Sequence, residues 1–396
     1  MSMSDNVRQQ MVEGSWIRRM FEEGAALKAL HGADKVCDLS LGNPIVEPPA
    51  EFEAELRRIV NNPTPGMHRY MANAGYEETR AAVAAELGRE TGVTMSARDV
   101  VMTCGASGAM NAVLKTLLNP GEEVIVLAPY FVEFLGYIDN HGGKPRVVKT
   151  NHNFLPDFAK LEQAIGPQTK ALILNSPNNP TGVVYPEEVI RQLGGLLARK
   201  EVELGQQIYL ISDEPYRRIV FDNLVPVPVF QHYHNSIVVT SHSKDLALPG
   251  ERIGYAALNP ESDEHDDLMA GFIHCNRVLG FVNAPALMQR VVAGVQGVTV
   301  SILEYERKRD LLFNGLTEMG YEVVRPQGAF YMFPRSPLES DVQFVRELLS
   351  LLVLAVPGRG FGWPGHFRIS YCVDDRTLEG SLEGFRKAAK QYGLTR

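Results

Sequence analysis

Between residues 99 and 244 the sequence repeats one unit, a short apolar run followed by a segment that favours a helix. The apolar runs are continuous, as expected of strands that are buried on both faces. We expect these strands at residues 99–104, 123–128, 146–150, 170–175, 207–212 and 237–240. Strands of this kind that alternate with helices are typical of a parallel sheet covered by helices on both sides. The repeated unit therefore predicts an α/β fold.

The residues that directly follow these strands have unusual chemistry for connecting segments. They are the small residues 105–109, the aromatic pair Tyr130 and Phe131, the amides Asn178 and Asn179, and the segments 213–216 and 241–244. Ligands of open α/β sheets bind at the carboxyl ends of the strands. Any one of these segments could be a plain turn or cap, but five at strand ends favour one shared site.

Lys244 follows the strand 237–240 and lies close in sequence to Ser241, Ser243 and Arg252. A lysine in a dry pocket near other positive groups loses its proton and can form a Schiff base with a carbonyl. Hydroxyl donors and a forked guanidinium suit a phosphate. Together these residues favour pyridoxal phosphate as a cofactor. For this segment alone, a lysine and an arginine on a solvated loop is the alternative.

Other strand-end residues provide what this cofactor needs. A buried carboxylate at Asp213 would keep the ring nitrogen protonated, and the alternative for it is a helix cap. Asn179 and Tyr216 can donate hydrogen bonds to the ring oxygen. The ring also needs a flat apolar partner, which Phe131 or Tyr130 can provide.

The segment 105–109 lies between a strand and a helix, where free backbone N–H groups can bind an anion. Its small side chains would let a phosphate approach, so Ala106 and Ser107 are candidates to bind it with Ser241 and Arg252. A tight turn without a ligand is the alternative, because the segment matches neither of the common glycine-rich phosphate motifs.

Composition excludes several classes of function. The net charge of −8 gives no electrostatic basis for binding nucleic acid or an anionic membrane. No apolar run approaches the length of a membrane span, and the N-terminus lacks a signal-peptide pattern, so we expect a cytoplasmic enzyme. The four cysteines lack metal-binding spacing, which predicts buried thiols and no metal site. They are Cys37, Cys104, Cys275 and Cys372.

The pattern changes after a helical segment at residues 281–314. We expect strands at 322–324, 328–333, 354–357 and 367–371, and helices at 341–352 and 377–392, which is typical of a smaller α+β unit. Arg368 lies within one of these strands. It suits bidentate binding of a carboxylate if it faces a cleft, and is otherwise an exposed arginine at a sheet edge.

Several short motifs occur together along the whole chain. They are Leu41–Pro44, Tyr70 with Gly75, Asn175–Gly182, Asp213–Tyr216, Ser241–Lys244 with Arg252–Gly254, and Phe367–Ser370. By these motifs and their order, the chain resembles the class I/II aminotransferases, the fold-type I pyridoxal phosphate enzymes related to aspartate aminotransferase. The resemblance implies a large domain with a mostly parallel seven-stranded sheet covered by helices, and a smaller α+β domain. We accordingly divide the chain into an N-terminal helix and arm (1–45) that is part of the small domain, a large cofactor-binding domain (46–290) and a C-terminal small domain (291–396).

The resemblance also implies roles for single residues. Lys244 would hold pyridoxal phosphate as an aldimine and move the proton, and Asp213 would pair with the ring nitrogen. Asn179 and Tyr216 would bind the ring oxygen, and Phe131, which matches the family position better than Tyr130, would stack on the ring. The phosphate would be bound by Ala106, Ser107, Ser241, Arg252 and the partner subunit's Tyr70, and the substrate carboxylate by Gly42, Asn179 and Arg368. Ala106 departs from the family pattern, in which glycine is frequent at this position.

The reaction implied is transfer of an amino group from an amino acid to a 2-oxo acid by a ping-pong mechanism, in a homodimer with the site at its interface. The alternatives are a carbon–sulfur lyase with the same cofactor, and a non-catalytic regulatory or binding protein on the same scaffold. Two residues are candidates to meet the substrate side chain. Arg69 could bind a second carboxylate, and Glu133 could face a basic group or lie in the first turn of a helix.

Overall fold

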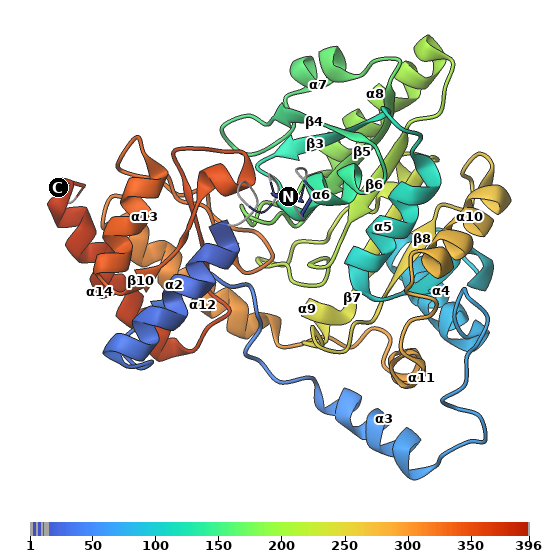
Figure 1. Cartoon of the computed structure of the whole chain (residues 1–396), viewed down its shortest axis with the longest axis horizontal. Coiled ribbons are helices and arrows are strands. Elements are labelled where there is room, and N and C mark those ends of the chain that lie inside the picture. Colours follow the sequence, from blue (N-terminus) through green and yellow to red (C-terminus); the bar gives the residue numbers. More distant parts are fainter. Residues whose placement is uncertain (1–2, 5–6, 9–10, 12–15, 395–396) are drawn as a thin grey trace.

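The computed structural model describes residues 3–4, 7–8, 11 and 16–394 (Figure 1). Its centre is a seven-stranded sheet with the strand order β2-β8-β7-β6-β5-β3-β4. The strands are β2 (Val100–Thr103), β3 (Glu123–Ala128), β4 (Lys144–Lys149), β5 (Thr169–Asn175), β6 (Tyr209–Asp213), β7 (Ser236–Ser241) and β8 (Gly254–Leu258). β3 to β7 pair in parallel, whereas β8 is antiparallel to both of its neighbours. The predicted α/β fold with a mostly parallel seven-stranded sheet is confirmed.

In every strand of this sheet except the largely exposed edge strand β4, successive residues enter two different hydrophobic cores, as the alternation of side chains in a strand requires. In β3, for example, Val124 and Val126 pack in one core, and Ile125 and Leu127 pack in the other. Because both faces are buried, the strands read as continuous apolar runs in the sequence.

Helices cover both faces of the sheet (Figure 1). One face carries α5 (Gly105–Leu117), α6 (Glu133–Asp139) and α10 (His265–Val278). The other carries α4 (Glu77–Thr91), α7 (Phe158–Ala164), α8 (Glu187–Leu204) and α11 (Ala286–Gly294). α3 (Ala50–Asn61) packs near α11, α9 (His242–Asp245) follows β7, and two 3₁₀ turns lie at Ala97–Asp99 and Val229–Gln231.

A smaller unit is built from the end of the chain. It contains a three-stranded sheet in the order β11-β12-β9 and a two-stranded parallel pair of β1 with β10. Its elements are β9 (Tyr331–Met332), β10 (Val353–Leu354), β11 (Val356–Pro357), β12 (Phe367–Ser370), α12 (Ile302–Glu318), α13 (Asp341–Ser350), α14 (Asp375–Gln391) and a 3₁₀ turn at Gly358–Phe361. The N-terminal segment joins this unit through β1 (Cys37–Asp38) and α2 (Trp16–His31), which lies beside the C-terminal helices in Figure 1.

Some expected elements differ from the structure. Residues 105–109 are the first turn of α5 and not a loop before it. Residues 322–324 are not a strand. β8 was not expected because its short run of glycine, tyrosine, alanine and leucine contains no β-branched residue.

Candidate active site

A cavity of about 300 Å³ lies where β5, β6 and β7 end, beside the first turn of α5 and beneath β12. It brings together eleven of the residues that the sequence predicts for one site. They are Gly42, Ala106, Ser107, Phe131, Asn179, Asp213, Tyr216, Ser241, Lys244, Arg252 and Arg368. These residues come from both ends of the chain as well as from the large sheet.

Tyr70 does not line this cavity. Its side chain is 89% exposed and lies on a separate surface with His68, Arg69 and Asn283. Arg69, the candidate to bind a second substrate carboxylate, therefore also lies away from the cavity of its own chain.

Lys244 occupies the short helix α9 that follows β7. Its Nζ donates a hydrogen bond to the backbone oxygen of Gly42 at 2.7 Å and lies 5.4 Å from the centre of the Phe330 ring. Burial, together with the nearby guanidinium groups of Arg368 and Arg252, lowers the pKa of this amine to about 8. A larger fraction of the amine is therefore neutral, and so nucleophilic, than in an exposed lysine.

Asp213 is the last residue of β6 and is buried. Burial, and then the neighbouring charge of Glu214, raises the pKa of its carboxyl to about 8. Its Oδ2 accepts a hydrogen bond from Asn175 Nδ2 at 3.3 Å, and within residues 16–394 no cation pairs with it. A buried carboxyl in this state favours its charged form once a cation lies beside it, which a protonated pyridine ring would provide.

The anion-binding end of the cavity is at the start of α5. Gly105 has a φ of +72°, and a Cβ there would lie 3.1 Å from Nη2 of Arg252. Glycine therefore lets the guanidinium approach the first turn of the helix, where backbone N–H groups are free. Ser107 accepts a hydrogen bond from the Tyr137 hydroxyl at 3.0 Å, and the Ser241 side chain makes no helix-capping bond. This set of donors suits a phosphate.

Arg368 lies on the middle strand of the three-stranded sheet and is 2% exposed, so the alternative of an exposed edge arginine is wrong. Its Nη1 donates to Asn179 Oδ1 at 3.1 Å, and its Nη2 donates to the backbone oxygen of Ser40 at 2.7 Å. The rings of Tyr331 and Phe361 lie 4.7 and 4.8 Å from its guanidinium carbon. The buried Nε has no partner, which leaves a donor for a carboxylate ligand.

Phe131 lines the cavity and packs edge-on against Phe134, with ring centres 5.5 Å apart. Tyr130 does not line the cavity, and its ring lies against Gly362 instead. Of the two aromatic residues at this strand end, Phe131 is the one that faces the cavity.

Three of the polar lining residues were not predicted to have a role: Tyr137, Tyr331 and Asn175. Tyr137 lies one helical turn after Glu133 in α6, so helical spacing could have indicated that both face the same side. Tyr331 is 3.0 Å from the Tyr216 hydroxyl, a contact between distant segments that no local pattern indicates.

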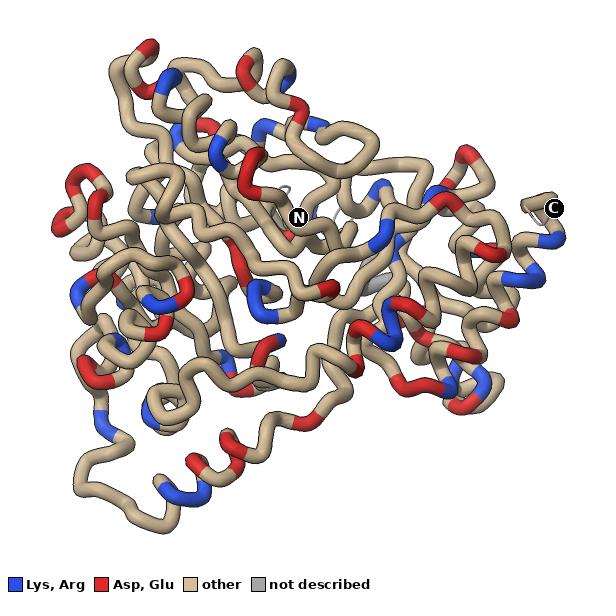
Figure 2. Tube along the Cα trace, turned by 180° about the vertical axis from the view of Figure 1, so that it is seen from behind, with Lys and Arg blue, Asp and Glu red and all other residues tan. Residues whose placement is uncertain are grey.

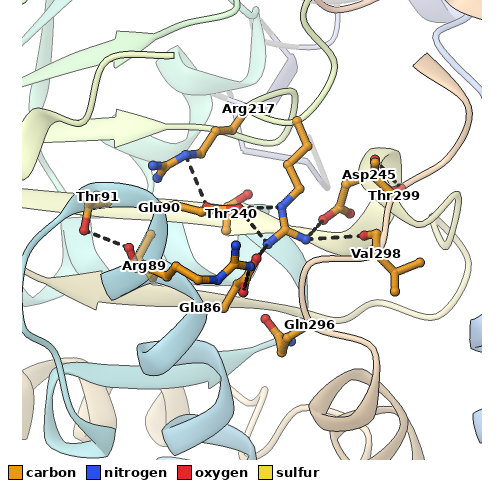
Figure 3. A network of polar contacts seen from close by, with 12 residues as sticks. Glu86, Arg89, Glu90, Thr91, Arg217, Thr240, Asp245, Gln296, Val298 and Thr299 are labelled. Atoms are coloured by element: carbon orange, nitrogen blue, oxygen red, sulfur yellow. Dashed lines mark hydrogen bonds and ion pairs between the residues drawn. The ribbon is translucent and has the colours of Figure 1, made fainter. Parts of the chain in front are cut away.

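A buried ionic network lies behind the cavity (Figure 3). Arg218 Nη2 contacts Glu86 at 3.0 Å and Glu90 at 2.9 Å, and its Nη1 lies 3.7 Å from Asp245, the residue after Lys244. The network therefore connects helix α4 to the segment that carries the lysine.

A second arginine extends this network. Arg217 Nη1 contacts Glu214, the residue after Asp213, at 3.1 Å, and its Nε contacts Glu90 at 3.5 Å. Glu90 is thus shared by both arginines. One helix is connected in this way to the segments that carry Asp213 and the lysine.

Three further features of the described residues are the potential metal ligands, the hydropathy of the helices and the distribution of charge. Within the residues that the structure describes, no group of three or more potential ligands could hold a metal ion. In the same part of the chain, no helix has the length and hydropathy needed to cross a membrane. Acidic and basic residues are interspersed along the chain in Figure 2.

Comparison with known proteins agrees with the chemistry of the cavity. The family model "Aminotransferase class I and II" matches residues 34–385. A probable aspartate/prephenate aminotransferase of Thermus aquaticus is 35% identical over 372 residues, which cover 90% of this chain and 92% of the relative. A probable aspartate aminotransferase of Methanocaldococcus jannaschii is 31% identical, covering 87% of this chain and 91% of the relative.

Solved structures are similar as well. A crystal structure of an aminotransferase from Eubacterium rectale superposes with a TM-score of 0.95 at 38% identity and covers 99% of both chains. Aspartate aminotransferase from Thermus thermophilus with maleate superposes with a TM-score of 0.85 at 29% identity, covering 98% of this chain and 100% of that one.

The fold and the cavity are those of a pyridoxal phosphate-dependent transferase. Within that class, the chain belongs to the class I and II aminotransferase family. It is an aminotransferase that acts on amino acids and 2-oxo acids.

Proposed function

We propose that this cavity carries out both half-reactions of amino transfer, with Lys244 as the group that moves the proton. One observation supports this most strongly. The buried amine of Lys244, with a pKa lowered to about 8, shares a cavity with Arg368, whose buried Nε has no partner. A proton acceptor and a carboxylate-binding group then face the same substrate.

The cofactor-binding residues divide by position. Ala106, Ser107, Ser241 and Arg252 would bind the phosphate of pyridoxal phosphate, because they surround the free N–H groups at the start of α5. Asp213 would pair with the ring nitrogen, and Phe131 would pack on the ring. Asn179 and Tyr216 would donate hydrogen bonds to the ring oxygen. When bound, the cofactor supplies an electron sink that makes the α-hydrogen of an amino acid acidic.

The substrate would be oriented by its α-carboxylate. Arg368 is held in place by Asn179, by the backbone of Ser40 and by two aromatic rings, so little rotamer freedom is lost when a carboxylate binds. The Gly42 backbone would border the same group. This would leave the α-hydrogen close to Lys244 Nζ, which accepts it as a general base.

We also propose a homodimer in the cytoplasm, with the partner subunit's Tyr70 completing the phosphate site. The high exposure of this tyrosine in the single chain supports that role. All four cysteines are free, which agrees with a reducing compartment, although Cys37 and Cys104 are half-buried and not fully buried as expected. The division at residues 45 and 290 into arm, large domain and small domain stays a prediction.

The test is the visible spectrum of the purified holoenzyme after single amino acids are added without a 2-oxo acid. We expect the cofactor band to change with a donor amino acid and to return when a 2-oxo acid is added. Turnover that needs no 2-oxo acid would point to the lyase instead. Lys244→Ala should remove the response while the protein stays folded.

A further inference from the structure

Glu133 is an acidic residue of the cavity that has no part in the proposed reaction. It is the first residue of α6, two positions after Phe131, and it lines the cavity together with Lys244 and Arg368. Across the part of the chain that the structure covers, its carboxylate has neither a hydrogen bond nor an ion pair with another residue. It is also exposed in the single chain, so a ligand can reach it.

Among the residues that the structure describes, the charged ones that line the cavity are Asp213, Lys244, Arg252, Arg368 and Glu133. The first four serve the ring nitrogen, the proton transfer, the phosphate and the substrate α-carboxylate. The substrate side chain is the one part of the substrate that none of these four residues binds. Glu133 is the one charged residue of this set without a role, so it is available to contact that side chain.

The surroundings give this carboxylate a definite preference. Although part of the side chain is exposed, the surrounding protein atoms desolvate the carboxyl and raise its pKa, while its own backbone N–H and Arg368 oppose the rise. The group therefore gains most from a ligand that brings a positive charge or N–H donors. A second substrate carboxylate would instead be repelled. Arg69, the arginine considered for a second carboxylate, is not available from the same chain, because it lies on a separate surface.

We propose that Glu133 determines the substrate class, favouring amino donors whose side chain ends in a cation or N–H donors and disfavouring dicarboxylates. This inference rests on the proposed function of the same cavity, in which Arg368 holds the α-carboxylate. It contrasts with the names of the relatives, several of which are aspartate aminotransferases.

The alternative is that Glu133 only stabilises the start of α6, since acidic residues are favoured in the first turn of a helix. Glu187 provides a matched control, because it is likewise exposed and the first residue of a helix, α8, but lies outside the cavity. Comparing Glu133→Gln with Glu187→Gln separates an effect on ligands from an effect on helices.

The experiment measures binding of three carboxylates to the holoenzyme by calorimetry. They are 4-guanidinobutanoate, 4-ureidobutanoate and glutarate, which share one linker and end in a cation, a neutral isostere and an anion. We expect the wild type to bind the guanidino compound about tenfold more tightly than the ureido compound, and glutarate most weakly. Glu133→Gln should bring the first two within about twofold, and Glu187→Gln should keep the wild-type order.

A wild type that binds glutarate most tightly, or an order that Glu133→Gln leaves unchanged, would overturn the proposal. If Glu133→Gln fails to fold, the order of the three affinities in the wild type still tests the proposal, because glutarate should bind most weakly. Failure of the proposed function has a different signature, because then none of the three carboxylates binds and no amino acid changes the cofactor spectrum.

Discussion

Lys244 Nζ donates a hydrogen bond of 2.7 Å to the backbone oxygen of Gly42, although the two residues are 202 positions apart in the sequence. The contact joins the N-terminal segment to the strand end that carries the lysine. Gly42 has no room for a side chain, because a Cβ there would clash with the Tyr331 hydroxyl.

Gly42→Ala should therefore disturb both the lysine and the carboxylate site. We expect overpacking to cost about 1–3 kcal/mol of stability and to raise KM for the amino donor. Gly195→Ala is the control, since it lies in α8 with open space around it and should be neutral or slightly stabilising. Steady-state kinetics and thermal unfolding of both variants check this, and equal behaviour of the two would contradict it.

The lowered pKa of Lys244 predicts how its reactivity depends on pH. In the cofactor-free protein, acetylation of this amine should rise as pH increases through about 8, because only the neutral amine reacts. In an ordinary lysine, half of the amine is neutral only near pH ~10.4. Mass spectrometry of briefly labelled protein gives the midpoint, and a midpoint close to the ordinary value would show that the amine is not desolvated.

Asp213→Asn should separate stability from function. The folded-state pKa of Asp213, about 8, lies above the ordinary value of 3.8, so the cofactor-free protein loses stability as pH rises from the lower towards the higher value. The asparagine variant does not titrate, so its Tm should change less over this range and should be no lower at pH 8. Its amino-transfer activity should nevertheless fall by about a hundredfold or more. If the Tm of Asp213→Asn depended on pH as the wild-type Tm does, the raised pKa of Asp213 would be contradicted.

The network behind the cavity predicts a positioning role for Arg218. Arg218→Gln removes from Glu86, Glu90 and Asp245 a cation that all three contact, and it should cost about 3 kcal/mol. We expect kcat to fall more than KM rises, because Asp245 adjoins the lysine and not the carboxylate site. Arg307→Gln, which removes an exposed ion pair with Asp375, should change stability by less than ~1 kcal/mol.

The proposed dimer can be tested by complementation. Tyr70→Ala should weaken cofactor binding and Lys244→Ala should be inactive. If the partner subunit's Tyr70 completes each site, a mixture of the two variants, unfolded and refolded together, forms hybrids with one intact site. Activity above that of either parent is expected, and a mixture that stays at the level of the parents would argue for a site within one chain.

The sequence predicted the site residues better than the contacts among them. Asp213 and Lys244 could be placed because each directly follows an apolar strand, and the ends of neighbouring parallel strands lie together. The burial of Arg368 could not be predicted, because it depends on β12 being the middle strand of a sheet formed from separate segments. Tyr331 was missed for the same reason, since its partner Tyr216 lies 115 positions away.

The fold shows the same division. Strands with β-branched residues were predicted within a few positions, whereas β8 was not, because tertiary pairing with β2 and β7 replaces local propensity there. The first turn of α5 was expected to be a loop, because glycine and serine are weak helix formers, yet the packing of α5 on the sheet makes it helical.

The pairing of β1 with β10 has a consequence for how the protein is made. Cys37 and Asp38 are synthesised long before their partners Val353 and Leu354. The segment that follows β1, with Ser40 and Gly42, is fixed against Arg368 and Lys244 only once this pairing has formed. A nascent chain can thus complete its large sheet while its cavity is still open on one side, and it becomes competent for amino transfer only after β10 and β12 have been synthesised.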